Sequence, residues 1–188
     1  MIPLLIVLFV IAGAIAYLLM LYNGLIAVKN NVDKAWANID VLLKQRHDEL
    51  PNLLEVCKGY MKYEGDTFER ITKARSQYSQ AQSVDQKVEA SAAVSGALGR
   101  LLATAENYPD LKANNDFMHL QTRISELESQ IADRREFYND SVNVYNIRIQ
   151  EMPDALLAGP MNLHPRTMFQ VAAEDKEPVK ISFSDVSH

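Results

Sequence analysis

The feature that most constrains this chain is an uncharged apolar run at its beginning. Residues 2–21 read IPLLIVLFVIAGAIAYLLML and contain no Asp, Glu, Lys or Arg. A helix of this length is about 30 Å long, which matches the hydrocarbon core of a bilayer. Tyr17 and Tyr22 lie near its end, where aromatic side chains favour the membrane interface. We therefore predict that residues 1–21 are a transmembrane anchor and that the lipid bilayer is a partner through residues 2–21.

Two other interpretations of the apolar run were weighed. The segment Ala14-Ile15-Ala16 resembles the small-residue cleavage site of a signal peptide, but no basic residue precedes the run. A buried core helix is the other alternative, and it is the weaker of the two. A retained single-pass anchor is favoured over both.

The basic residues around the run predict its orientation. No Lys or Arg precedes it, whereas Lys29, Lys34, Lys44 and Arg46 follow it. The positive-inside rule then places the remainder of the chain in the cytoplasm.

Composition narrows the classes of partner and fold. The chain has 188 residues, 19 of them basic and 24 acidic, for a formal net charge of −5. This balance argues against nucleic acid as a partner, because nucleic-acid binding favours a basic surface. Only 7 Gly and 7 Pro are present, so long helices are favoured over a turn-rich β fold. Cys57 is the single cysteine and excludes an internal disulfide.

Apolar residues continue at helical spacing after the run, at Leu25, Val28, Val32, Trp36 and Ile39. The anchor is therefore predicted to continue directly into the first helix of the soluble part. The pattern breaks around residues 46–48, where Asp48 is a plausible N-cap and Pro51 would lie in a first turn. The stretch from Ile39 to Glu64 is thus predicted to be a helix–turn–helix corner. One kinked helix through Pro51 is the alternative.

Three further helices are expected. The second continues through Phe68 and Ile71 to Tyr78, and Ser83 with Gln86 resembles a capping box that begins the third. The third ends near Asn107, because Tyr108-Pro109 is unfavourable within a helix. The fourth carries a coiled-coil-like seam, with Arg134 at a skipped position, and ends at Pro153. The apolar members of the seam are Phe117, Leu120, Ile124, Leu127, Ile131, Tyr138, Val142, Tyr145, Ile149 and Met152.

These elements predict an all-α fold. Its transmembrane helix (1–21) continues into a long antiparallel up-and-down four-helix bundle (22–152), followed by an irregular C-terminal tail (153–188). Within the tail, the segment PVKISF at residues 178–183 is expected to be an edge strand or disordered.

Several residue types typical of active sites cluster between Ile39 and Glu64, including His47, Asp48, Glu49, Cys57 and Glu64. Cys57 lies in an amphipathic pattern and is ten residues from His47, so a packing role is favoured over a nucleophile.

The sequence also lacks the usual metal and phosphate motifs. None of the Glu residues considered as metal ligands has a His three residues on, and Gly96-Ala97-Leu98-Gly99 lacks the spacing of a phosphate-binding loop. His47, His119, His164 and His188 are widely separated. We therefore assign no catalytic, cofactor-binding or metal-binding residue, expect no cofactor, and predict that the protein is not an enzyme.

Three polar or aromatic positions have a structural interpretation. Arg134-Arg135 is flanked by Asp133 and Glu136, which favours a solvated or salt-bridged face over an anion site. Asp40 either faces solvent or is partly buried against an Arg or a backbone donor. Trp36 is predicted to be a large core residue close to the membrane.

Several blocks of the sequence resemble the LemA family of bacterial membrane proteins. They are YNGLIAVKNNVDKAW, IDVLLKQRHDELPNLLEVCKGYMKYE with the following ARSQ, LGRLLATAENYPDLKANNDFMHLQ and REFYNDSVNVYNIRIQEMP, in that order. The resemblance covers Tyr22 to about Phe183. The chain departs from the family pattern at Glu49-Leu50, at Tyr63-Glu64 and in the tail segment AGPMNLHPRTMF.

The resemblance implies an N-terminal anchor in the bacterial inner membrane, a long helical bundle and no known enzymatic activity. It also implies a membrane-organising role, because some family members are associated with building internal membrane compartments. We therefore predict a membrane-anchored helical scaffold that forms homo-oligomers or holds membrane or cytoplasmic proteins. The alternative is a tethered binding module for a ligand, peptide or lipid headgroup, with the tail as a lid. An unrecognised hydrolase is the third hypothesis.

Overall fold

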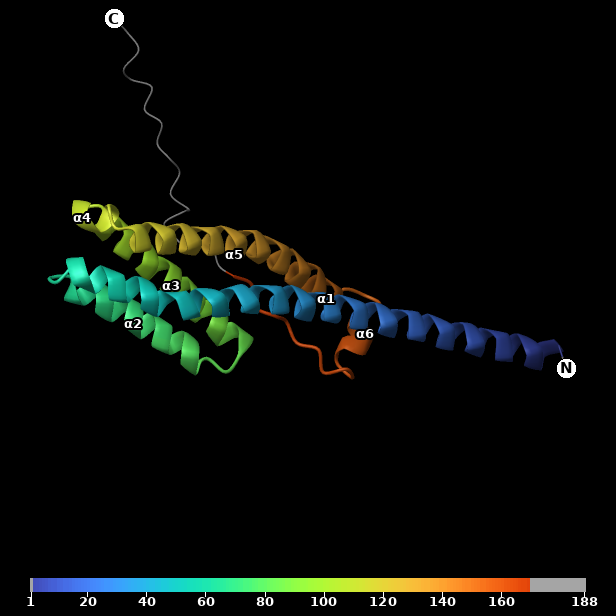
Figure 1. The fold of residues 1–188 in the computed structure, drawn as a ribbon. Helices are drawn as coiled ribbons and strands as arrows, with labels where there is room; N and C mark the ends of the chain where they lie inside the picture. The colour runs from blue at the N-terminus through green and yellow to red at the C-terminus, as the bar shows by residue number, and fades with distance from the viewer. Residues whose placement is uncertain (1, 170–188) are drawn as a thin grey trace, which may run out of the picture.

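The computed structural model describes residues 2–169, and all regular secondary structure in this range is helical. The elements are α1 (Ile2–Tyr60), α2 (Gly65–Gln80), α3 (Val84–Ala105), α4 (Pro109–Lys112), α5 (Asn115–Arg148) and α6 (Ala155–Ala158). Figure 1 shows α1 as the longest element, with its N-terminal part projecting away from the other helices. The predicted all-α class with a long N-terminal apolar helix is confirmed.

The N-terminal part of α1 has the dimensions of a membrane span. It contains a window of 18 residues with a mean hydropathy of 3.0, none of which is buried by other parts of the protein. Within residues 2–169, α1 is the one helix long and apolar enough to cross a bilayer. The buried stripe of α1 begins at Leu25, directly after this segment.

α1 continues through Pro51, so the predicted N-cap at Asp48 and the corner at that position are wrong. The buried residues Ile39, Leu43, Arg46 and Leu50 follow one another at intervals of four, three and four, and the stripe extends to Cys57. An interior proline destabilises a helix by about 3 kcal/mol. Burial of Leu50, Leu53 and Leu54 offsets this loss, because each fully buried leucine contributes about 1.5–3 kcal/mol.

The first corner of the fold lies between Met61 and Glu64. Met61 is fully buried and its backbone N–H donates to Cys57 O, which completes the last turn of α1. Tyr63 is 94% exposed at the tip of the turn. The predicted second helix is therefore divided between α1 and α2.

The predictions for α3 are confirmed. Ser83 Oγ accepts from Gln86 N, and the Gln86 side chain accepts from Ser83 N, as a capping box requires. α3 ends at Ala105, and Pro109 occupies the first turn of the short α4.

The seam of α5 is largely confirmed. Of its predicted members, eight are buried and Leu120 is partly buried. Met152 is 71% exposed and does not belong to the seam, because α5 ends at Arg148 and the chain turns before Pro153.

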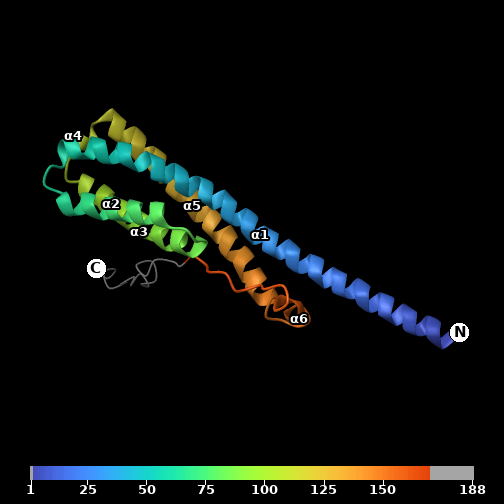
Figure 2. The ribbon, with the colours of Figure 1, turned by 90° about the horizontal axis from the view of Figure 1, so that it is seen from below.

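The long helices form two antiparallel pairs. α1 packs along α5, and α2 packs along α3 (Figure 2). The buried apolar side chains divide into two clusters. The cluster nearer the anchor centres on α1 and α5, with contributions from α2 and α3, and the distal cluster contains residues of α1 to α5.

Part of the predicted irregular tail is ordered against the helices. Residues 159–169, called here the return segment, follow α6 without regular secondary structure and end at the buried Phe169. The predicted strand or disordered segment at 178–183 lies outside the described residues.

Candidate functional site

The structure separates the reactive residue types between Ile39 and Glu64. His47, Asp48 and Glu49 lie on the continuous α1, whereas Cys57 is fully buried in the distal cluster. Glu64 lies in the turn before α2 and accepts a hydrogen bond from Tyr108 Oη at 2.9 Å. These groups do not converge on one site.

Cys57 occupies a packing position. Burial raises the pKa of its thiol to about 11, so the thiolate that a nucleophile requires is strongly disfavoured near neutral pH.

His47 is partly buried beside α2. Its ring lies 5.4 Å from the Tyr78 ring, and its Nε2 is 3.4 Å from Ser79 Oγ. Burial lowers the pKa of His47, and Arg75 lowers it further. The ring is therefore neutral near pH 7 and packs against an aromatic side chain.

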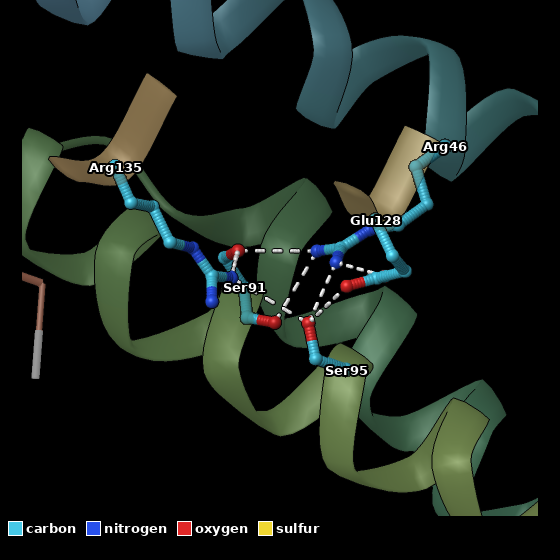
Figure 3. Close-up of polar contacts among 5 residues, drawn as sticks. All are labelled: Arg46, Ser91, Ser95, Glu128 and Arg135. Carbon is cyan, nitrogen blue, oxygen red and sulfur yellow. Dashed lines mark hydrogen bonds and ion pairs between the residues drawn. The ribbon is translucent and has the colours of Figure 1, made fainter. Parts of the chain in front are cut away.

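The main polar site was not predicted. It is a layer of five side chains from three helices: Arg46 of α1, Ser91 and Ser95 of α3, and Glu128 and Arg135 of α5 (Figure 3). We call it the polar layer. Arg46, at 1% exposure, is its most deeply buried charged member.

Arg46 is the centre of the polar layer. Its Nη1 lies 2.5 Å from Glu128 Oε1 and 2.8 Å from Ser95 Oγ. Its Nη2 donates to both the carbonyl and the hydroxyl oxygen of Ser91, at 3.2 and 3.1 Å. Ser95 Oγ in turn donates to Glu128 Oε2 at 3.0 Å. One buried cation thus connects α1 to both α3 and α5.

Arg135 adds a second cation to the layer. Its Nη2 donates to Ser91 Oγ at 3.1 Å, and its guanidinium lies 5.0 Å from the centre of the Phe169 ring. Of the predicted solvated or salt-bridged face, Arg134 is exposed, whereas Arg135 turns inward and contacts a serine of α3. Burial lowers the pKa of Arg135, and the nearby Arg46 lowers it further.

The polar layer lies between the two apolar clusters. Leu43 belongs to the cluster near the anchor and Leu50 to the distal one, with Arg46 between them in the sequence. Likewise, Ala90 and Val94 flank Ser91 in the two clusters. Hydrogen bonds of fixed geometry at this level favour one register of α1, α3 and α5, as buried polar residues do in coiled coils.

The chemistry of the polar layer is structural. Its serines contact arginines and one carboxylate that is itself paired with Arg46. No histidine is among the hydrogen-bond partners of these serines in the described range, so the usual base of a serine nucleophile is missing there. Within residues 2–169, no group of three or more His, Cys, Asp or Glu residues is arranged to hold a metal ion.

Asp40 is partly buried, as one of its two predicted environments requires, but its partners differ from those expected. Lys87 Nζ lies 2.7 Å from Asp40 Oδ1, and Tyr78 Oη donates to the same oxygen at 3.4 Å. Burial raises the pKa of Tyr78 to about 12, and Asp40 acts in the same direction.

Trp36 was predicted to be a core residue, but it is only partly buried at the edge of the core, where it contacts the return segment. Its ring stacks with Phe169 at 6.2 Å between centroids and meets Tyr138 edge-on at 5.8 Å. His119 is exposed on α5.

The fold and the polar layer together define a class: a helical protein with one N-terminal helix of membrane-spanning length, whose buried polar groups connect helices. The chain belongs to the LemA family, whose family model matches residues 35–183.

The chain is also similar to several individual proteins. It is 28% identical to Protein LemA of Metamycoplasma hominis over 162 residues, which cover 85% of this chain and 74% of that protein. It is 26% identical to Magnetosome protein MamQ 1 of Paramagnetospirillum magneticum over 174 residues, or 79% of this chain and 64% of MamQ 1. Magnetosome protein MamQ of Magnetospirillum gryphiswaldense is 24% identical over 77% of this chain and 62% of its own length. The match therefore spans less than two thirds of the MamQ proteins. None of these names designates an enzymatic activity.

Proposed function

We propose that this protein is a non-enzymatic membrane-anchored scaffold that self-associates or holds partner proteins at the bilayer. The observation that carries the proposal is the continuity of α1, which passes from a span-length apolar segment into the helical core without a break. A continuous helix transmits the position of the anchor to the core, as a scaffold requires.

Two further observations support a structural role. The buried polar layer connects three helices, and Cys57, the one thiol, is buried and has a raised pKa. A role in organising membranes is supported by the resemblance to the LemA family, and two of the matched relatives are named as magnetosome proteins. We further propose that the anchor lies in the bacterial inner membrane and that the core faces the cytoplasm.

Light scattering tests self-association. The mass of the full-length protein in detergent is compared with that of a variant lacking residues 1–21, which leaves the core intact because its buried stripe begins at Leu25. Defined oligomers of the full-length chain alone would indicate assembly through the anchor, and oligomers of both would locate the contact on the helical core. A lone monomer with no copurifying partner would refute the scaffold.

One substitution tests whether the anchor itself mediates self-association. A Cβ added at Gly13 would meet no atom within 4 Å in the monomer, and the apolar segment around it is not buried, so Gly13→Leu is expected to leave the fold unchanged. Small residues allow membrane helices to approach closely, and leucine at this position blocks that approach. Assembly through the anchor predicts a loss of oligomers in Gly13→Leu and their retention in the control Phe9→Leu.

A second candidate function is a tethered binding module. The observation in its favour is the return segment, whose backbone accepts hydrogen bonds from Asn139 and Asn146 of α5 and whose Phe169 stacks on Trp36 of α1. Deleting residues 155–188 uncovers these side chains and is expected to change binding in a ligand screen. Unchanged binding would count against the binding-module function.

The hydrolase hypothesis has a direct test. Replacing Cys57 and His47 together by alanine is expected to leave cellular function intact, because the two residues do not share a site. Loss of function in a variant that remains folded would support the hydrolase hypothesis.

A further inference from the structure

The return segment is held by side chains that bind its backbone. Asn139 Nδ2 donates to Phe169 O at 3.0 Å while Phe169 N donates to Asn139 Oδ1 at 2.8 Å. Asn146 makes the same pair of bonds to Arg166, at 2.9 and 2.8 Å. Each asparagine thus satisfies both backbone groups of one residue, as a neighbouring strand would.

Two tyrosines add a second row of contacts. Tyr138 Oη donates to Thr167 O and Tyr145 Oη donates to His164 O, both at 3.1 Å. All four groups of α5 bind backbone atoms of the return segment. These contacts are therefore independent of the side chains that the bound chain carries.

The contacts follow a matched repeat. On α5, Tyr138-Asn139 recurs as Tyr145-Asn146, seven residues later, and their partners on the return segment are three residues apart in both rows. Seven helical residues span about 10.5 Å, and three residues of an extended polyproline-like chain span about 9.3 Å. The two spacings agree closely enough for a regular ladder. The repeat identifies the face of α5 as a surface that fits an extended peptide.

Side-chain contacts select which peptide fits. Phe169 is buried against Trp36, Tyr138 and Arg135, with its ring 5.6 Å from that of Tyr138. Three residues earlier, Arg166 Nη2 lies 3.4 Å from Asp33 Oδ1 at the surface. The surface thus offers a site for an aromatic side chain and, three peptide residues before it, an acidic site.

We propose that the surface under the return segment is a binding site for an extended peptide with a basic residue three positions before an aromatic one. We call it the peptide-binding face, and its members are Asp33 and Trp36 of α1 and Tyr138, Asn139, Tyr145 and Asn146 of α5. In this structure the chain's own Arg166-Thr167-Met168-Phe169 occupies it. The ligand in trans is a partner segment of the same chemistry, which the return segment excludes until it is displaced. The proposal deepens the binding-module function and rests on it.

The bound segment itself identifies the ligand. Backbone-directed hydrogen bonds supply affinity for any extended chain, and side-chain sites supply specificity, as in other modes of peptide recognition. A tethered segment competes at an effective concentration in the millimolar range. Weakening the tethered occupant should therefore strengthen binding of a free peptide.

The test uses the full-length protein in detergent and a fluorescent peptide of residues 160–171, PMNLHPRTMFQV, monitored by anisotropy. The variant Phe169→Ala empties the aromatic site of its own occupant and is expected to bind the peptide at least tenfold more tightly than wild type. A peptide with alanine in place of its phenylalanine should not bind. Because Phe169→Ala also removes core contacts, its folding is checked by circular dichroism. Arg166→Ala, which alters only a surface pair, should change affinity in the same direction by a smaller factor.

The asparagines provide the decisive comparison. Adding Asn139→Ala and Asn146→Ala to Phe169→Ala removes four of the six hydrogen bonds that α5 makes to the backbone of the bound chain and is expected to weaken peptide binding strongly. Adding Asn143→Ala, an exposed asparagine of the same helix, should leave binding unchanged. Equal affinity with and without the two asparagines would overturn the assignment of the peptide-binding face but leave a binding module with its site elsewhere. Absence of peptide binding in every folded variant would overturn both the peptide-binding face and a peptide-binding function.

Discussion

At the scale of single residues, Arg46 combines full burial with a charge. It is 1% exposed, while its carboxylate partner Glu128 has a side chain 30% exposed. Removing one member of such a pair leaves the other charge without its partner, and for the buried arginine water cannot replace it. The two residues are therefore coupled, and the coupling can be measured.

The first prediction is a double-mutant cycle in this pair. Arg46→Met and Glu128→Gln are each expected to lower the free energy of unfolding by about 2–3 kcal/mol, through the loss of charged hydrogen bonds. The double variant should lose at least about 1 kcal/mol less than the sum. Denaturant unfolding of the purified protein measures all three, with the exposed Arg134→Met as a control near zero. Additive losses would show that the pair is not coupled.

The second prediction concerns Cys57 and alkaline pH. Its folded-state pKa of about 11 lies above its ordinary value near 9, so folding favours the protonated thiol. The corresponding stability is fully present below pH 9 and is lost as the pH rises from 9 to 11, by about 2–3 kcal/mol in total.

Denaturant unfolding at pH 8 to 11 checks this loss. Between pH 9 and 11 the unfolded wild-type chain releases the thiol proton that the folded protein keeps, so its free energy of unfolding falls with pH. Cys57→Ala lacks this proton, and its free energy of unfolding should fall less steeply over the same range. The variant starts from a lower stability because the substitution leaves a small cavity. Parallel curves for the two proteins would contradict the raised pKa. Slow reaction of the native thiol with a maleimide at pH 8 gives an independent check.

At the scale of elements, the sequence predicted what local patterns determine. The Ser83–Gln86 capping box and the end of α3 near Asn107 depend on a few adjacent residues, and both were predicted correctly. The predicted corner near Asp48 was wrong because it relied on the low helix propensity of Pro51. Burial of the leucines around Pro51 keeps α1 continuous. Its position at residues 61–64 depends on tertiary packing of Met61.

The polar layer shows a second limit of sequence reasoning. Arg46 lies four residues before Leu50 and three after Leu43, and Arg135 lies four residues after Ile131 and three before Tyr138. Both arginines thus occupy core positions of their stripes, which was a usable signal. Their charge favoured a surface interpretation, because burial becomes favourable only with partners from other helices. The return segment was unpredictable for the same reason, since its hydrogen bonds to α5 join residues 19 to 30 positions apart and its ion pair with Asp33 joins residues 133 positions apart.

The third prediction tests how Pro51 is tolerated within α1. Pro51→Ala restores the missing backbone N–H and removes the steric conflict with the preceding turn. The gain is offset in part by the larger entropy of the unfolded chain, so a net stabilisation of about 1–2 kcal/mol is expected. Thermal unfolding measures it, with Pro109→Ala at the first turn of α4 as the matched control, where proline is favourable and its removal should not stabilise. Destabilisation by Pro51→Ala would indicate that α1 needs the proline for its shape.

At the scale of the whole molecule, α1 determines how far each surface lies from the bilayer. The 39 residues from Tyr22 to Tyr60 extend about 58 Å beyond the predicted anchor. Trp36 and the aromatic site of the return segment are within about 25 Å of the anchor along this axis. The turn at Tyr63 is at the far end. A ligand of the peptide-binding face would therefore be held close to the membrane, and the distal core would serve as a spacer or second contact surface.

The last prediction concerns the side of the membrane on which this far end lies. Lys29, Lys34, Lys44 and Arg46 follow the anchor and no Lys or Arg precedes it, which predicts a cytoplasmic core. The reporter is Tyr63→Cys in a Cys57→Ala background, because Tyr63 is 94% exposed and far enough from the lipid for a reagent to reach it. A membrane-impermeant maleimide should label inverted membrane vesicles and leave intact spheroplasts unlabelled until detergent is added. Labelling of intact spheroplasts would place the core outside the cytoplasm. The peptide-binding face would then meet extracytoplasmic peptides, so this outcome decides in which compartment its ligand is to be sought.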